Sequence, residues 1–318
     1  MVVYLVVCLF AFFIVYLLIP VTKRWATQFG VVDQPNSRKI HQTPIPLSGG
    51  LAIYIGSIST LFLFFPSTPL NDVLAWGGLL LLLIGLVDDW FKSKGKDFPA
   101  WPKLLGQIGS AIFAYAMGIQ FFGISRFWDG RGLMIFPDWI AVLMTIVWIV
   151  GFINMINFLD GMDGLAGGIT TISSLTLFFI AILKHQFDVA SLAVIMIGAS
   201  LAFLRHNFHP ASIFLGDAGS MFLGYVIGVT SLYGTMKSAT LLTLTITILA
   251  LGVPVFDTIQ VIFMRIKEGS PIYKPDRRHV HHRLMSTGLS QRQAVMVIYA
   301  IGIGFSVLSI LLLIYSNG

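Results

Sequence analysis

Runs of about 18 to 25 apolar residues, uninterrupted by charge, recur along the whole sequence. A helical run of this length matches the hydrocarbon core of a bilayer, whereas the strands of a membrane barrel are shorter and alternate in polarity. The chain is therefore expected to be an all-α polytopic membrane protein with ten transmembrane helices. Their approximate cores are residues 3–21, 48–65, 73–87, 104–122, 139–156, 165–183, 189–204, 219–234, 239–264 and 293–313.

The composition supports a membrane protein of one domain. Of 318 residues, 56% are hydrophobic and 11% are charged, which leaves too little polar surface to coat a soluble globule. The longest polar segment only joins the last two apolar runs, so residues 1–318 are predicted to form a single membrane domain. Around Asp129 and Gly130, flanking apolar residues indicate either a β-hairpin or a simple connecting loop.

The distribution of Lys and Arg predicts the orientation. With the N-terminus outside, the inside loops are residues 22–47, 88–103, 157–164, 205–218 and 265–292. These loops contain 16 of the 20 basic residues, which predicts that both termini are outside. The net charge of +6 then lies on the cytoplasmic face, where it attracts anionic membrane lipids or anionic soluble substrates. No nucleic-acid-binding motif is present.

Carboxylates at the edge of a membrane are informative, because a charged residue at membrane depth costs about 2.5–3.5 kcal/mol. Three separate segments place them at predicted inside ends of spans. Asp88 and Asp89 occur in "GLVDDWFK", Asp160 and Asp163 in "INFLDGMDGLAGG", and Asp217 in "FLGDAGS". Five carboxylates thus gather at one membrane surface.

Each carboxylate alone is also compatible with an ordinary helix terminus or an Asp-Gly turn. The adjacent pair Asp88–Asp89 is not, because it is self-repelling and negative charge is disfavoured at a helix C-terminus. A hard divalent cation would neutralise it, and Mg²⁺ prefers oxygen ligands from carboxylates and phosphates. If the chain is helical there, Asn157, Asp160 and Asp163 are successive i,i+3 neighbours that face one site.

The last inside loop is basic and rich in histidine. It reads "MRIKEGSPIYKPDRRHVHHRL". Four of its residues are predicted to bind a polyanionic substrate: Arg278, His279, His281 and His282. Two other interpretations remain open, a topogenic positive-inside loop and a histidine metal site.

Two further features each allow a structural interpretation. Gly49 and Gly50 permit close approach of the backbone to a ligand, or simply end a loop before a helix. Asp257, inside the ninth run, is interpreted as a structural partner for a cation such as Arg265.

Acidic pairs, a metal, a basic loop and a bilayer together indicate phosphoryl transfer to a lipid at the cytoplasmic interface. A secondary transporter is the alternative from another class, but transporters place such groups near the midplane and show paired repeats. A membrane prenyltransferase would cluster several Asp within each helical stretch, and "GLVDDWFK" has only the pair.

Taken together, these motifs resemble those of the polyprenyl-phosphate N-acetylhexosamine-1-phosphate transferases. This is the WecA and TagO group of glycosyltransferase family 4, which is related more distantly to MraY. The resemblance covers about residues 20–290. Its motifs occur in family order, from "RKIHQTPIPLSGG" through "GLVDDWFK", "NMINFLDGMDGLAGG" and "FLGDAGSMFLG" to "GSPIYKPDRRHVHHRL".

The resemblance implies a reaction in the bacterial cytoplasmic membrane. N-acetylhexosamine 1-phosphate would pass from a UDP-N-acetylhexosamine, expected to be UDP-GlcNAc, to undecaprenyl phosphate, giving the lipid diphosphate-sugar and UMP. The cofactor implied is Mg²⁺, with Mn²⁺ as an alternative. The polymer that the product primes, the sugar epimer and the formation of a homodimer stay open.

The resemblance also implies roles for residues. Asp217 and Asn157 match metal ligands, and Asp88 and Asp89 match the essential acidic pair, predicted to strip the residual proton of the lipid phosphate and orient it. A direct displacement is favoured over an aspartyl intermediate, because a phosphate monoester is mostly dianionic at neutral pH.

The remaining roles concern the binding of substrates. Lys92 completes the family's DDxxK motif, Phe214 and Asp163 match positions that hold uracil, and Asp160 lines the nucleotide site. The "HVHH" stretch matches the family's HIHH signature with Val280 for Ile. Because Val280 interrupts the histidines and Arg283 follows them, the GlcNAc branch is favoured over the MurNAc-pentapeptide branch.

Overall fold

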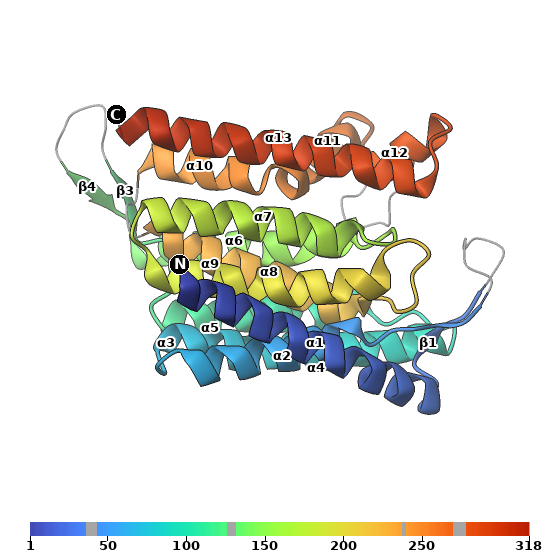
Figure 1. The fold of residues 1–318 in the computed structure, drawn as a ribbon. Helices are drawn as coiled ribbons and strands as arrows, with labels where there is room; N and C mark the ends of the chain where they lie inside the picture. Colours follow the sequence, from blue (N-terminus) through green and yellow to red (C-terminus); the bar gives the residue numbers. More distant parts are fainter. Residues whose placement is uncertain (36–42, 126–131, 237–239, 270–277, 318) are drawn as a thin grey trace.

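The structure is a computed structural model and describes residues 1–35, 43–125, 132–236, 240–269 and 278–317. It is mostly helical (Figure 1). The helices are α1 Val2–Gln28, α2 Gly49–Phe64, α3 Pro69–Asp72, the π-helical turn η1 Val73–Gly77, α4 Gly78–Ser93, α5 Ala100–Ala116, α6 Asp138–Leu159, α7 Leu165–Leu183, α8 Phe187–Asn207, α9 Gly216–Met236, α10 Leu241–Ala250, α11 Gly252–Lys267, α12 Val280–Ser286 and α13 Gln291–Asn317.

Each of the ten predicted segments overlaps a helix, although α5 ends at Ala116, before the predicted end at residue 122. The chain is therefore a mostly helical multi-pass membrane protein. Among the described residues, six helices have the length and apolar composition of a membrane span. The ninth predicted segment is not one straight helix: it divides at Leu251 into α10 and α11, bent by 90°, and the pair counts as a seventh span only if taken together. Ten crossings therefore remain a prediction.

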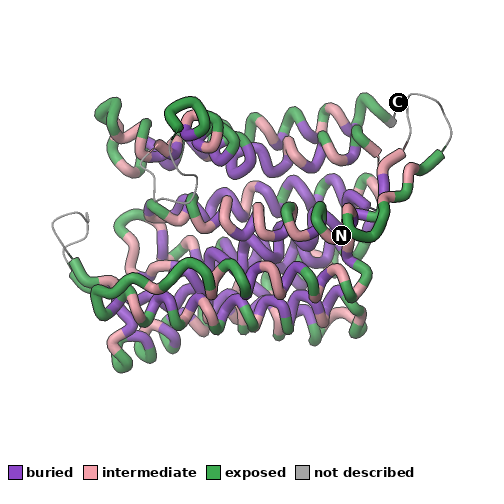
Figure 2. Tube along the Cα trace, turned by 180° about the vertical axis from the view of Figure 1, so that it is seen from behind, coloured by how far each residue is buried: buried purple, intermediate pink, exposed green. Residues whose placement is uncertain are grey.

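The long helices run side by side, with α13 and α10 on one flank of the bundle and α2 and α4 on the opposite flank (Figure 1). Buried residues fill the middle and exposed residues face outward (Figure 2). Backbone groups that meet lipid must be paired within their own segment, which is why apolar runs of this kind become helices. Both termini lie at one end of the bundle, and β1 and α12 lie at the other (Figure 1).

Two short antiparallel strand pairs lie at the ends of the bundle. Strands β3 (Gly123–Ser125) and β4 (Leu133–Ile135) pair with each other, so of the two alternatives for this segment the hairpin is correct and the simple connecting loop is wrong. Its turn around Asp129 and Gly130 lies outside the described residues. Strands β1 (Val32–Asp33) and β2 (Ile45–Pro46) pair before α2 begins.

Helix α9 is the centre of the bundle. It packs against α2, α4 and α6, and every residue from Gly216 to Met236 is buried except Tyr233, which is half-buried. Two glycines bring neighbours into backbone contact with it. A Cβ at Gly224 would lie 2.6 Å from the Ile153 Cα of α6, and one at Gly85 of α4 would lie 2.3 Å from the Ala218 Cα. The second contact sets the acidic pair of α4 beside the start of α9.

Candidate active site

Two lysines and two aspartates from three helices form an ionic cluster. The Lys103 ammonium of α5 donates to Asp88 Oδ2 of α4 at 2.6 Å and to Asp217 Oδ2 of α9 at 2.5 Å. The Lys92 ammonium lies 2.7 Å from Asp217 Oδ1 and 3.7 Å from Asp88 Oδ2. Both carboxylates are nearly buried, with 3% and 10% of their side chains exposed. The sequence predicts a divalent cation as the counter-charge of the acidic pair, and in the structure Asp88 is paired with two lysines of the chain itself.

Asp89 is placed differently from Asp88. Its Oδ1 accepts from the backbone N–H of Asp217 at 2.9 Å and its Oδ2 from that of Ala218 at 3.2 Å. The side chain is buried, and the first N–H groups of a helix carry partial positive charge that a carboxylate stabilises. Asp89 therefore fixes the start of α9, and with it the position of the Asp217 side chain.

Asn157 joins the cluster from α6. Its Nδ2 donates to Asp217 Oδ1 at 3.3 Å and to Ser220 Oγ at 2.7 Å. The two predicted metal-ligating residues therefore lie in contact. Oxygens of Asp88 and Asp217 already converge on one cation, the Lys103 ammonium, and carboxylate and amide oxygens are ligands that Mg²⁺ accepts. The carboxylate oxygens at this point are suited to a divalent cation, whereas Asn157 presents its Nδ2 and not its amide oxygen to Asp217. Among the described residues, no group of three or more His, Cys, Asp and Glu is arranged to hold a metal ion.

The three acidic and amide residues of "INFLDGMDGLAGG" do not share one helix face. Helix α6 ends at Leu159, so Asp160 and Asp163 follow it in a turn. Burial, together with the charges of Asp217 and Asp89, raises the pKa of Asp160, as expected of a carboxyl near the ionic cluster. Asp163 is directed elsewhere: its Oδ2 lies 2.8 Å from His209 Nδ1 and accepts from the Ala211 N–H at 3.1 Å. It ties the turn to the loop that leads into α9.

The glycines after this turn admit an aromatic ring from α13. Gly164 has a positive φ of 80°, and its carbonyl accepts from the Tyr299 hydroxyl at 2.6 Å. A Cβ at Gly168 would lie only 1.8 Å from that hydroxyl oxygen. The glycine-rich stretch is therefore a docking point for α13.

The "PLSGG" segment packs on the start of α9. Phe214 donates its N–H to the Pro46 carbonyl at 2.9 Å and accepts from the Gly49 N–H at 3.0 Å. A Cβ at Gly50 would lie 2.2 Å from the Gly219 nitrogen, so the close approach that this glycine permits is to α9. The Phe214 side chain is half-buried against Ala26, Val31 and Leu47, and its predicted contact with uracil stays a prediction.

The "HVHH" stretch leads into α12 and lies against the turn after α6. A Cβ at Gly161 would be 2.8 Å from His281 Nε2. His281 is 1% exposed, and burial and the neighbouring His282 lower its pKa to about 4, so its ring is neutral at physiological pH. Its Nδ1 has no hydrogen-bond partner within the part of the chain that the structure describes. Arg278 forms an ion pair with Glu268 at 2.7 Å.

Asp257 holds the start of α12. Its Oδ1 accepts from the Val280 N–H and its Oδ2 lies beside His279 Nδ1, both at 2.8 Å. The structural role predicted for Asp257 thus involves His279 and the helix start. His279, predicted as a substrate-binding residue, has one ring nitrogen committed to this contact.

Asp257→Asn should lower the thermal unfolding midpoint in detergent, because the amide offers one acceptor where two are used, at a cost of about 1–2 kcal/mol. Catalytic rate per folded molecule should stay within about twofold, since no site residue changes its charge. Thermal scans of Asp257→Asn measure the shift in midpoint, and Asp97→Asn is the control because Asp97 is exposed. An unshifted midpoint with lost activity would instead place Asp257 in the reaction.

Sequence reasoning missed Lys103 as a site residue. Its charge was explained by the positive-inside pattern, and nothing in "AWPKLLGQ" indicates carboxylate partners on two other helices. The signal available was a lysine at the very start of an apolar run. Ser220 and His209 were also missed, because their partners Asn157 and Asp163 lie far away in the sequence.

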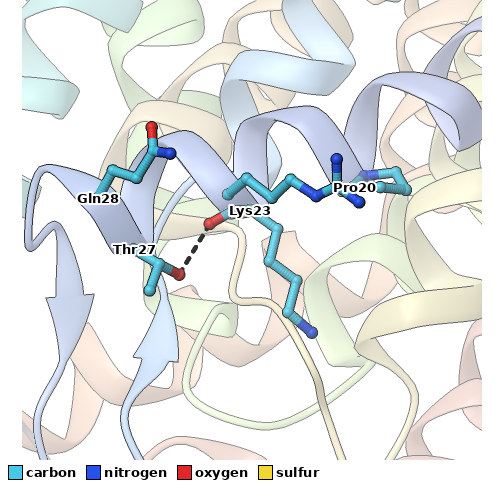
Figure 3. A pocket seen from close by; sticks show the side chains of 5 residues that line it. Pro20, Lys23, Thr27 and Gln28 are labelled. Atoms are coloured by element: carbon cyan, nitrogen blue, oxygen red, sulfur yellow. Dashed lines mark hydrogen bonds between the residues drawn. The ribbon is translucent and has the colours of Figure 1, made fainter.

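A surface cavity of about 480 Å³ lies away from these residues, at the end of α1 (Figure 3). Its lining comes from one helix, and Thr27 Oγ1 donates to the Lys23 carbonyl at 2.9 Å beside it. Since none of the predicted site residues lines this cavity, the ionic cluster remains the candidate active site.

Comparisons with known proteins agree with one another. A model of the family described as "Glycosyl transferase family 4" matches residues 73–235. A probable undecaprenyl-phosphate N-acetylglucosaminyl 1-phosphate transferase of Bacillus subtilis is 39% identical over 302 residues, covering 94% of this chain and 82% of the relative. A decaprenyl-phosphate N-acetylglucosaminephosphotransferase of Mycolicibacterium smegmatis is 36% identical, covering 86% and 73%. An undecaprenyl-phosphate alpha-N-acetylglucosaminyl 1-phosphate transferase of Pasteurella multocida is 31% identical, covering 86% and 76%.

Proposed function

The chain belongs to glycosyl transferase family 4, and from this premise we propose that it transfers N-acetylglucosamine 1-phosphate from UDP-N-acetylglucosamine to undecaprenyl phosphate. The products are the lipid diphosphate-sugar and UMP. The observation that carries the proposal is the cluster in which Lys92 and Lys103 meet Asp88 and Asp217 at one point. Such a mixture of ammonium groups and carboxylates can hold a diphosphate and a divalent cation together.

The orientation that goes with this function is part of the proposal. We place the protein in the bacterial cytoplasmic membrane, with ten crossings, both termini outside and the ionic cluster on the cytoplasmic side. Its support is the distribution of basic residues and the position of the two termini at one end of the bundle (Figure 1).

Mg²⁺, held by Asp217 and Asn157, would neutralise charge on the diphosphate of the donor. Lys92 and Lys103 would orient the phosphate oxygens, since their ammonium groups lie at the same point and Lys92 is 44% exposed. Asp160, Asp163 and Phe214 would lie toward the nucleotide, and Arg278, His281 and His282 toward the sugar phosphate.

An oxygen of the lipid phosphate would attack the sugar-bearing phosphorus, and the bond from that phosphorus to the bridging oxygen would break as UMP leaves. Asp88 would orient the lipid phosphate and take its residual proton. Asp89 would act indirectly, because both of its oxygens already accept backbone N–H groups of α9. Isolation of a phospho-sugar aspartyl adduct without lipid acceptor would replace this direct displacement by a two-step route.

The test is release of UMP by the purified protein in detergent with undecaprenyl phosphate and Mg²⁺. Parallel reactions contain UDP-GlcNAc, UDP-GalNAc, UDP-glucose or UDP-MurNAc-pentapeptide. UMP should form with UDP-GlcNAc and require both lipid and metal ion. Activity only with the pentapeptide donor would move the protein to the other branch, and no UMP with any donor would reject the transferase.

A further inference from the structure

A pair of amides lies one helical turn below the ionic cluster. Gln107 of α5 is 2% exposed, and its Oε1 accepts from Asn154 Nδ2 of α6 at 2.8 Å. Its Nε2 donates to Asn154 Oδ1 at 3.4 Å and lies 3.7 Å from the Met221 sulfur of α9. The two amides therefore bond to each other reciprocally and join three helices at one level.

The orientation of both amides is fixed by a third group. Asn154 Nδ2 also donates to the Val150 carbonyl at 2.8 Å, so this end of the Asn154 side chain must be the nitrogen. The Gln107 atom that faces it must then be the oxygen, which directs Gln107 Nε2 to Asn154 Oδ1. The oxygen of each amide therefore accepts from the nitrogen of the other.

Each residue of the amide pair lies three or four positions from a residue of the cluster on the same helix. Gln107 follows Lys103 by four residues on α5, Asn154 precedes Asn157 by three on α6, and Met221 follows Asp217 by four on α9. Residues three or four apart lie above one another on a helix face. The amide pair and Met221 thus lie one helical turn below Lys103, Asn157 and Asp217, the side chains that meet in the cluster.

We propose that Gln107 and Asn154 are positioning residues, which hold Lys103 of α5 at its working distance from Asn157 of α6 and Asp217 of α9. The inference rests on the proposed function. Within a bilayer an amide that loses its partner finds no water, so the pair selects one register of α5 against α6. Helix α5 also bonds to Gly77 of η1 through Ser110, and the amide pair is the side-chain contact that fixes its register against α6 at the level below the cluster.

The variants are Gln107→Leu, Asn154→Leu, the double variant, and the exchange of Gln107→Asn with Asn154→Gln. The matched control is Gln186→Leu, because Gln186 is also buried and donates to the Gly234 carbonyl at 2.9 Å, near the opposite end of α9. The measurements are kcat and KM for UDP-GlcNAc in UMP release, calorimetric binding of UDP, and the thermal unfolding midpoint.

Each single Leu variant should lose about tenfold in kcat, because a small displacement of a group at the reacting phosphates is costly. UDP should also bind more weakly to these variants, since Lys103 lies where the diphosphate is proposed to bind. The double variant should lose no more than either single, since both remove one interaction. The exchanged pair should recover to within about threefold of the wild type. Gln186→Leu should match the single variants in unfolding midpoint and keep the wild-type kcat.

Three outcomes would overturn the inference while the wild type releases UMP: an unchanged kcat in the single variants, losses that multiply in the double variant, or an equal loss in Gln186→Leu. The last would make the amides general packing groups. If the wild type releases no UMP with any donor, the proposed function fails first and this role fails with it.

Discussion

Asp217→Asn should reduce UMP release by about a thousandfold or more. The Asp217 carboxylate faces Lys92 and Lys103 and accepts from Asn157, so its charge organises every other group of the cluster. An asparagine side chain has one acceptor oxygen and no charge, so it cannot balance two ammonium groups or bind Mg²⁺ as strongly. The protein should still fold, because the bond from the backbone N–H at position 217 to Asp89 does not depend on the side chain.

The measurement for Asp217→Asn is initial UMP release over a Mg²⁺ titration, with thermal unfolding as the check on folding. Asp188→Asn is the matched control, since Asp188 is an exposed carboxylate at the other end of the neighbouring helix α8. The control should keep wild-type activity. Equal activity of the Asp217 variant across the titration would remove Asp217 from the metal site.

Lys103→Gln should reduce UMP release by about a hundredfold and also lower the unfolding midpoint. Without the Lys103 ammonium, Asp88 and Asp217 would face each other with Lys92 as the neighbouring cation, and Lys92 lies 3.7 Å from Asp88. Removing one partner from a buried ionic cluster typically costs about 3–5 kcal/mol, because the remaining charge stays buried. The loss should affect both binding of the donor and kcat, since Lys103 lies where the diphosphate is proposed to bind.

Lys96→Gln is the control for this substitution, because Lys96 is exposed in the loop that follows α4. Activity assays and thermal scans on both variants decide the outcome. A Lys103→Gln protein with wild-type stability and activity would contradict both the ionic role and its place in the site. Lys103→Arg distinguishes charge from shape, and partial activity is expected because the charge remains on a bulkier group.

The apolar runs predicted the helices because a bilayer leaves few other solutions for such segments. The break at Leu251 was missed, since apolar residues continue through it. The cue was Pro254, which lies in the first turn of α11, where proline is tolerated and helix starts are common. The predicted segment 239–264 instead places this proline inside a span.

The motifs predicted which segments meet, and the structure brings Asp88, Asn157 and Asp217 together. Their individual contacts could not be predicted. Adjacent residues of a helix point in different directions, so Asp88 faces the lysines while Asp89 meets the start of α9. Asp163 and His209 are 46 residues apart, and sequence spacing carries no information on such a pair.

The nearly complete burial of α9 bears on what keeps this helix in the membrane. Helix α9 contains glycines, serines and threonines as well as Asp217. It is not among the six helices of the described residues whose length and apolar composition suit a membrane span. A helix of this kind is stable in a bilayer only when other helices shield it. Helices α2, α4 and α6 supply that shielding, so the place of the central carboxylate in the membrane depends on the packing of these helices around α9.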